Sequence, residues 1–215
     1  SGRTVLFVSH NMVAVRNLCT RVVELDKGRL VADGPSDEIV KAYISAQTAA
    51  GGTELHLQQP LGRPEELVVT GARVLDEQGR SEGPFHSSRP LFVEIDVEVA
   101  RENEGYQVGF DLLSVDGLVL RSWHTDGPEG DWPPLRAGRA TLRCEVPAGL
   151  LNEGRYAIAP RADVYRTYWL VNGDDAVWFE MLHDHSESPL SLGGSLGVVA
   201  PVFDWRAAET HAPQA

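Results

Sequence analysis

The sequence has few cysteines and no long apolar run, and both features narrow the class of protein. Its 215 residues include only two cysteines, Cys19 and Cys144, which are too few for a disulfide framework and fit a reducing compartment. No apolar run approaches the roughly 20 residues that span a bilayer, and no charged and then apolar signal segment opens the chain. We therefore expect a cytoplasmic protein.

Positive charge is also scarce. The chain has 19 Lys and Arg against 31 Asp and Glu, a formal net charge of −12. Residues 1–46 hold six bases and five acids, so the rest of the chain holds 13 bases and 26 acids. Such an acidic surface repels phosphate backbones and anionic headgroups. This predicts that the larger part does not bind nucleic acid and favours a neutral or cationic ligand.

Motifs of the common catalytic sites are absent from the sequence. It contains no G-x-x-x-x-G-K-[ST] phosphate loop and no Ser or Cys in a nucleophile elbow. Acidic pairs are numerous, as expected by chance in a chain with 31 acids, and carboxylates of unknown separation do not define a glycosidase. We therefore predict that this chain by itself is not an enzyme.

One short stretch has the residue types of a metal site. In Met181-Leu182-His183-Asp184-His185, the two histidines alternate as they would on one face of a strand. A third ligand is not evident near them, and residues 186–189 indicate a loop. We interpret the stretch as a solvated strand end and predict no metal site.

The first 46 residues have the pattern of a small α/β unit. Thr4 to Val8 is a short apolar run rich in β-branched residues, which is typical of a buried strand in a parallel sheet. Residues 11–20 have the apolar spacing of an amphipathic helix, and residues 22–31 contain two apolar runs joined by Asp-Lys-Gly, a hairpin signal. Ser36 then caps a second predicted helix over about residues 37–46.

The composition changes twice after residue 46. Residues 47–66 are rich in Ala, Gly, Gln and Pro without periodicity, so we predict a linker. Residues 67–205 contain short apolar runs between turn signals, which predicts an antiparallel β-sandwich of the immunoglobulin-like or jelly-roll-like kind. Residues 206–215 have no pattern and are predicted to be a disordered tail. The expected fold class is therefore mainly β, preceded by a small α/β fragment.

The individual strands of the sandwich can be placed from the period of two. The clearest is Leu91–Val99, in which apolar and acidic residues alternate strictly. The other strands are expected at Val68–Leu75, Tyr106–Ser114, Leu118–His124, Ala140–Val146, Gly154–Asp163, Tyr168–Val171, Ala176–His183 and Gly197–Phe203.

The order of features in residues 1–46 resembles the last portion of an ABC-transporter nucleotide-binding domain. The features that carry the resemblance are Ser9-His10-Asn11 after the strand, Leu18-Cys19, the hairpin around Asp26-Lys27-Gly28, Gly34-Pro35 and Tyr43. The resemblance implies that His10 is the switch histidine, which contacts the γ-phosphate of ATP. Without the phosphate loop and a Ser-Gly-Gly signature, this polypeptide is not expected to hold ATP or Mg²⁺, the cofactors of the full-length family, and His10 is expected to be inactive.

The second part of the chain resembles the C-terminal carbohydrate-binding domain of Wzt-type ATPases, which partner a membrane permease to export lipid-linked O-antigen polysaccharides. The segments that carry this resemblance are Val74 to Gly79, Val115-Asp116-Gly117, Val146-Pro147, Gly154-Arg155-Tyr156, Gly197-Val198-Val199 and Pro201 to Trp205. The resemblance implies a polysaccharide ligand, a permease partner, a homodimer and a place beside the inner membrane.

Two segments offer what sugar recognition requires. Aromatic faces contact the apolar face of a pyranose, and planar polar groups bind its hydroxyls. By the period of two, Arg121 and Trp123 share one face of their strand, and we predict that this face is the outward one. The candidate glycan-binding residues are Arg121, Trp123, His124, Asp126, Arg161, Tyr165, Tyr168 and Trp169.

Structural roles compete with this interpretation. Trp123 and Trp169 could equally be core or rim aromatics, since sandwich cores commonly hold a Trp. We expect Trp178, which is flanked by Val177 and Phe179, to be structural, and Cys144 to be a core residue. Trp132 stands beside two prolines in a loop and could cap a site.

The sequence therefore predicts the substrate-recognition module of an ABC exporter. It would bind the terminal region of a lipid-linked O-antigen polysaccharide, while ATP hydrolysis would belong to a segment that this chain lacks. Two alternatives remain open at this stage. The sandwich could be a glycan hydrolase or lyase, or it could be a purely structural domain that dimerises a transporter.

Overall fold

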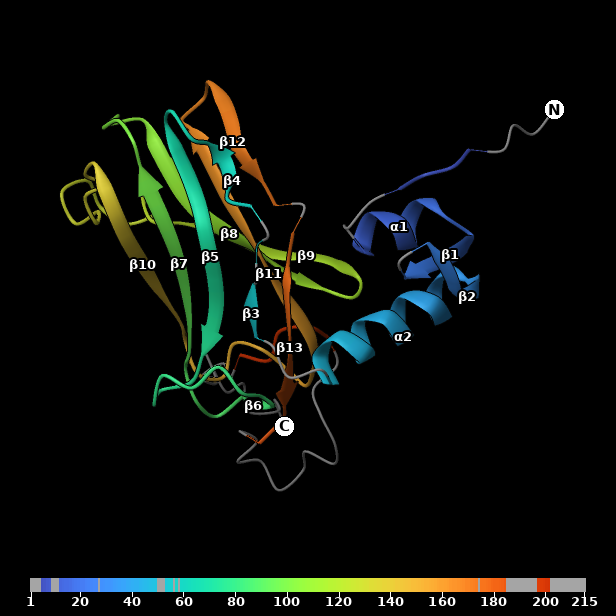
Figure 1. The fold of residues 1–215 in the computed structure, drawn as a ribbon. Helices are drawn as coiled ribbons and strands as arrows, with labels where there is room; N and C mark the ends of the chain where they lie inside the picture. Colours follow the sequence, from blue (N-terminus) through green and yellow to red (C-terminus); the bar gives the residue numbers. More distant parts are fainter. Residues whose placement is uncertain are drawn as a thin grey trace, which may run out of the picture.

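The structure is a computed structural model of the chain. It describes residues 5–8, 12–26, 28–49, 53–55, 57, 59–173, 175–184 and 197–201. His10, the predicted tail at residues 206–215 and the last two residues of the predicted strand Gly197–Phe203 lie outside the described residues. The described part of that segment, residues 197–201, is not a strand: Val199 makes a single isolated bridge with Leu151. Figure 1 shows two stacked sheets with a smaller helical unit beside them.

The first sheet contains the strand with the strictest alternation. Its order is β10 (Gly138–Val146), β7 (Leu91–Val99), β5 (Leu67–Leu75) and β3 (Glu54–Leu55), and β4 (Leu61–Arg63) also pairs with β5. All of these pairings are antiparallel. β7 buries every second residue, as its sequence predicts.

The second sheet packs against the first. Its order is β6 (Phe85–His86), β13 (Val177–Leu182), β11 (Gly154–Val164), β8 (Tyr106–Ser114) and β9 (Gly117–Trp123), with β12 (Tyr168–Asn172) paired to β11. The pairings are antiparallel except between β13 and β6, which run parallel. The fold is therefore the predicted antiparallel β-sandwich, with one short parallel pair at an edge.

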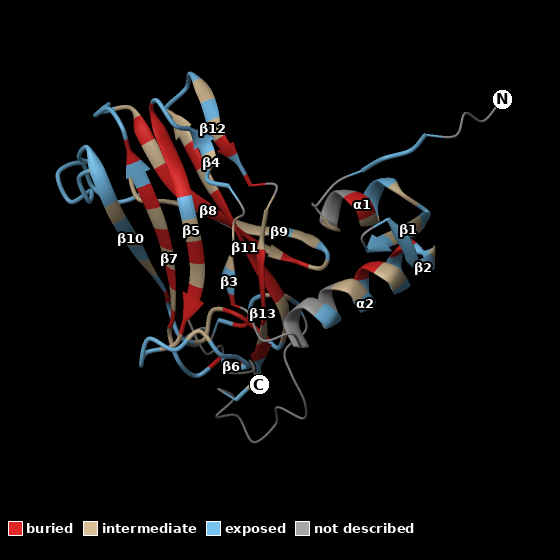
Figure 2. Cartoon of the chain, in the orientation of Figure 1, coloured by how far each residue is buried: buried red, intermediate tan, exposed pale blue. Residues whose placement is uncertain are grey.

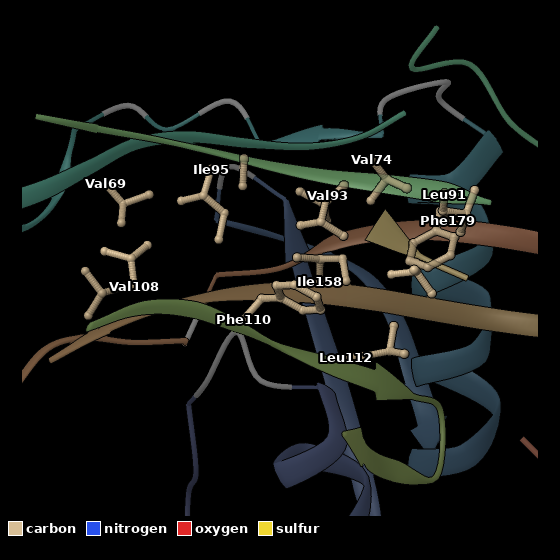
Figure 3. Packing of buried hydrophobic residues seen from close by; sticks show 14 of the residues in the cluster. Val69, Val74, Leu91, Val93, Ile95, Val108, Phe110, Leu112, Ile158 and Phe179 are labelled. Carbon is tan, nitrogen blue, oxygen red and sulfur yellow. The ribbon is translucent and has the colours of Figure 1, made fainter. Parts of the chain in front are cut away.

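The core lies between the two sheets. Figure 3 shows Val93 and Ile95 of the first sheet facing Phe110 and Ile158 of the second. Each of these side chains is at most 3% exposed. Burying a side chain of this size stabilises a fold by about 1.5–3 kcal/mol, so the inward residues of these strands dominate the stability of the sandwich.

The small unit holds two helices and a hairpin. Its elements are α1 (Met12–Leu18), β1 (Arg21–Asp26), β2 (Arg29–Pro35) and α2 (Ser36–Ala49). Gly28 has a positive φ of 78° in the hairpin turn, as predicted. Ser36 is buried at the first position of α2, with acids Asp37 and Glu38 in the first turn. Figure 2 shows that this unit is mostly exposed compared with the sandwich strands.

The small unit docks on the outer face of the second sheet. Val15 of α1 and Val40 of α2 form a buried cluster with Ala157 and Trp178, so the predicted structural role of Trp178 is confirmed. Arg16 extends the contact by pairing with Asp116 in the β8–β9 turn, at 2.8 Å between Nη1 and Oδ1. The same guanidinium donates a hydrogen bond to the carbonyl oxygen of Val115. Apolar burial and an ion pair thus hold the unit beside the sandwich.

Two further sequence-based expectations differ from the structure. Residues 5–8 form no strand and are exposed, Val8 by 94%, because no described strand pairs with them and a strand needs hydrogen-bonded neighbours. The segment predicted as a linker is partly regular, since α2 extends to Ala49 and both β3 and β4 pair with β5. Short edge strands lack the apolar period that would reveal them. The domain boundaries themselves stay predictions.

Asp184 ties the end of β13 to the segment that follows β6. Its Oδ1 accepts a hydrogen bond from the backbone N–H of Ser88 at 2.8 Å, and its Oδ2 lies 3.1 Å from Nδ1 of His86. Burial acts to raise the pKa of Asp184, but the bonds from Ser88 and Ser87 and the nearby His86 outweigh it and hold the pKa below its usual value.

This lowered pKa predicts the sign of a pH effect. The Asp184 carboxylate stabilises the fold fully above its unfolded pKa, about 3.9, and the contribution is lost as the pH falls through the lower folded pKa. We expect Asp184→Asn to cost about 1 kcal/mol or less at pH 7. Urea unfolding at pH 7 and near pH 2.5 should show that this difference from the unmodified protein becomes smaller in acid. A constant difference would contradict the assignment.

Candidate functional site

The outer face of the first sheet is a ladder of paired charges. Arg73 of β5 bonds Glu94 and Asp96 of β7, and on β10 Arg143 bonds Glu94 and Arg139 bonds Glu98. These side chains pair with one another, and the guanidinium of Arg143 also lies over the ring of Phe92, 4.0 Å from its centroid. This face therefore presents paired charges rather than an aromatic platform.

The outer face of the second sheet is different, because aromatic and arginine side chains gather there. Asp111 of β8, Arg121 and Trp123 of β9, Arg161 of β11 and Trp169 of β12 form a group that we call the Trp/Arg cluster. Strand register brings them together, since Asp111 lies opposite Arg121 on the neighbouring strand β9. The prediction that Arg121 and Trp123 share an outward face agrees with this arrangement.

The two tryptophans of the cluster form one aromatic surface. Their rings are stacked with centroids 6.0 Å apart and planes inclined by 27°. Trp169 is 43% exposed, so the surface is open to solvent. The guanidinium of Arg121 lies 5.6 Å from the ring centroid of Trp169, and that of Arg161 lies 5.2 Å from it. These cation–π contacts hold the ring in place.

Asp111 fixes both arginines. Only 3% of this residue is exposed. Arg121 donates from Nε to Oδ1 at 2.6 Å and from Nη2 to Oδ2 at 3.0 Å. Arg161 donates to Oδ2 from Nε at 2.9 Å and from Nη2 at 2.6 Å, and its Nη1 donates to Asn172 at 2.8 Å. Hydrogen bonding to Asp111 is the main cause that raises the pKa of Arg121. The same carboxylate therefore fixes the orientation of both guanidinium groups.

Gly109 lets the ring of Trp123 lie against the sheet. A Cβ at position 109 would collide with the carbonyl oxygen of Ser122 and would stand 2.9 Å from Cε3 of Trp123. Gly109 lies directly opposite Trp123 in the β8–β9 ladder, so any side chain there would displace the ring. A glycine inside a strand commonly marks such a close approach.

Asp163 completes the cluster with an unusual carboxylate. A bulge between Ala162 and Asp163 places Asp163 opposite Trp169 in the β11–β12 ladder. Its Oδ1 is buried and has no hydrogen-bond partner among the described residues. Burial raises the pKa of Asp163, and the nearby charge of Arg121 opposes that rise. Neither Asp111 nor Asp163 was among the residues predicted from the sequence, although a charge within apolar β8 is a usable signal for Asp111.

Two predicted residues on and after β9 lie outside the cluster. His124 follows Trp123 and so points to the opposite side, where its Nδ1 accepts a bond from the backbone N–H of Val108 at 3.0 Å. Burial lowers its pKa. Asp126 instead accepts a bond from the backbone N–H of Trp123 at 2.7 Å, which fixes the start of the turn. Asp126 therefore helps to hold the backbone of Trp123 in place.

The two predicted tyrosines also lie apart from the tryptophans. Tyr165 stands at the tip of the β11–β12 hairpin beneath Arg166, which has a positive φ of 54°. Tyr168 precedes Trp169 and therefore faces the other side, where it donates to Glu66 at 2.6 Å and lies beneath Arg63. The structure thus groups four of the eight predicted residues, Arg121, Trp123, Arg161 and Trp169.

A hollow opens beside the cluster, between the edge strands β9 and β10. It has a volume of about 240 Å³, and its lining includes Ser122, His124, Pro133 and Cys144. Cys144 is half-buried and packs against the core, as predicted, and burial raises the pKa of its thiol. Within the described part of the chain, no group of three or more His, Cys, Asp or Glu side chains could hold a metal ion. None of the described helices is long and apolar enough to cross a membrane.

Comparison of the sequence with known proteins finds ATP-binding proteins of ABC transporters. The chain is 28% identical over 134 residues to the methionine import ATP-binding protein MetN of Rhodopseudomonas palustris, which covers 55% of this chain and 36% of that protein. It is 40% identical over 42 residues to the teichoic acids export ATP-binding protein TagH of Staphylococcus saprophyticus, which covers 20% of this chain and 16% of TagH. The chain thus spans well under half the length of these relatives.

Comparison of the structure with solved structures identifies the fold. The crystal structure of the C-terminal domain of Wzt superposes with a TM-score of 0.55 at 10% sequence identity, and the match covers 74% of this chain and 94% of that domain. The sandwich therefore has the fold of the Wzt C-terminal domain. No protein-family model matches the sequence.

Proposed function

We propose that this chain is the substrate-recognition part of an ABC exporter. In this proposal it binds the terminal region of a lipid-linked O-antigen polysaccharide at the outer face of the second sheet. The observation that carries the proposal is the open pair of Trp123 and Trp169, framed by two arginines that Asp111 immobilises. A rigid aromatic platform with fixed polar groups is the arrangement that suits a sugar ring.

The likenesses to known proteins support the transport role. The sequence is similar to ABC ATP-binding proteins, and the fold is similar to the Wzt C-terminal domain. Both similarities support a part in an ABC transporter. In this proposal the protein is a cytoplasmic homodimer. It contacts a membrane permease at the inner membrane. This chain is not proposed to hydrolyse ATP, and the polysaccharide is its proposed ligand.

The alternative of a glycan hydrolase or lyase finds less support at the cluster. A glycosidase needs two available carboxyl groups beside the bound sugar. Asp111 is 3% exposed and is occupied by four hydrogen bonds from Arg121 and Arg161, so it cannot serve as an acid or a nucleophile.

Isothermal titration tests the proposed function. The probe is the O-polysaccharide released from the bacterium that makes the protein, and dextran serves as an unrelated glycan. We expect saturable binding of the O-polysaccharide and none of dextran. Equal binding of both glycans, or a dimer that binds neither, would reject recognition and favour a purely structural role. Release of reducing ends from the O-polysaccharide would favour the enzyme instead.

A further inference from the structure

The Trp/Arg cluster contains one hydrogen-bond acceptor that the protein leaves unused. Asp111 is saturated by the two arginines, whereas Oδ1 of Asp163 is buried without a partner among the described residues. A buried acceptor without a donor costs a fold about 1–3 kcal/mol, and more if it is charged. Natural structures satisfy most such groups, so this exception requires an explanation.

The location of Asp163 suggests what could satisfy it. It is half-buried on β11, between Gln107 of β8 and Trp169 of β12 in the two ladders. Arg121 is close enough to influence its charge, but Arg121 gives its Nε and Nη2 donors to Asp111. Gln107 directs its side-chain amide to Thr125. The neighbours of Asp163 therefore have other partners, while the exposed ring of Trp169 lies beside it.

The hydrogen bonds of the two arginines bear on whether the site can also bind an anion. The side-on pair of Nε and Nη2 is the edge of a guanidinium that binds a carboxylate or phosphate through two parallel bonds. In both Arg121 and Arg161 this edge is taken by Asp111, and Nη1 of Arg161 bonds Asn172. The two arginines are balanced by the two aspartates. The side-on edges of both arginines are therefore occupied, whereas Oδ1 of Asp163 has no donor among the described residues.

We propose that Asp163 is the residue that selects the sugar, by accepting hydrogen bonds from adjacent hydroxyl groups of a neutral pyranose stacked on Trp169. This inference rests on the proposed function and narrows its ligand class. Donors from a neutral sugar satisfy Asp163, whereas a uronic acid or a phosphorylated sugar would bring a second negative charge to it. Carboxylates bind sugar hydroxyls through charge-assisted bonds, which are about twice as strong as neutral ones.

The test combines binding and stability, because the two should change in opposite directions. In Asp163→Asn, we expect the affinity for the O-polysaccharide of the bacterium that makes the protein to fall by roughly 10-fold to 100-fold. The melting temperature should stay the same or rise by about 2 °C, since the variant no longer buries a carboxylate oxygen that lacks a hydrogen-bond donor. A residue that only supports the fold would lower the melting temperature. Glu98→Gln, on the outer face of the first sheet, is the matched control and should change neither quantity.

Ionic strength separates the ligand classes. Binding of a neutral sugar should keep its Kd within about twofold between 50 and 500 mM NaCl, whereas binding of an anion to the arginines should weaken by roughly 10-fold. Unmodified protein that fails to bind the O-polysaccharide would overturn the proposed function and this inference together. Binding that survives Asp163→Asn, or that salt strongly weakens, would overturn the inference alone.

Discussion

Replacing Trp123 with alanine should abolish binding of the O-polysaccharide and leave the sandwich folded. Trp123 supplies half of the aromatic surface, stacked 6.0 Å from Trp169 on the outer face of the second sheet. Tryptophans at the centre of a binding surface contribute about 2 kcal/mol or more, so titration should show at least a ~30-fold loss of affinity. Outward rings fill no core volume, and the circular dichroism spectrum should therefore stay unchanged.

A matched pair of variants separates the aromatic surface from general effects of tryptophan removal. Trp169 is 43% exposed and Trp132, in the loop after β9, is 38% exposed. Trp132 donates to the carbonyl oxygen of Gly127 rather than joining the cluster. We expect Trp169→Ala to weaken binding as strongly as Trp123→Ala, and Trp132→Ala to keep it within about threefold. Equal losses in all three variants would place the binding surface elsewhere.

The largest effect on stability is expected from Asp111→Ala. This carboxylate is 4% exposed at its side chain, and it neutralises Arg161, which is 14% exposed, and Arg121, which is 34% exposed. Its removal leaves two guanidinium groups on a sheet face without their counter-ion. Breaking a buried ion pair from one side costs about 3–5 kcal/mol, and denaturant unfolding should show a loss of this size. Binding should fall as well, because the arginines would no longer be held.

The control for Asp111 lies on the opposite face of the sandwich. Glu98 pairs with Arg139 at 3.3 Å, but their side chains are 47% and 86% exposed. An exposed pair is worth about 0–1 kcal/mol, so Glu98→Ala should hardly change the free energy of unfolding. A loss below about 1 kcal/mol for Asp111→Ala would show that the cluster is not a buried charge network.

The strands could be predicted because each one carries its own signal. Leu91–Val99 and Tyr106–Ser114 have the bounds expected from the sequence, since apolar alternation is a property of consecutive residues. The edge strands β3, β4 and β6 have two or three residues each and hold no such period. Residues 5–8 show the reverse case, in which a strong strand signal forms no strand without a partner.

The candidate site could be predicted only in part, for the same reason. The period of two puts Arg121 and Trp123 on one face, and the aromatic residues around position 169 indicate a second contributor. Alternation also separates Tyr168 from Trp169, but the bulge at Ala162 and Asp163 shifts the register, and the sequence does not reveal it. The roles of Asp111 and Asp163 depend on strands that meet only in the folded chain.

The sequence by itself determined the class of fold and the alternation of the main strands, because these follow from local patterns of apolar residues. Only the tertiary structure decided which outer face carries the tryptophans and which carries paired charges. Sheet order and register join residues that lie far apart in the chain, and no local pattern encodes them. Those pairings leave Asp111 with two partners and Oδ1 of Asp163 with none among the described residues.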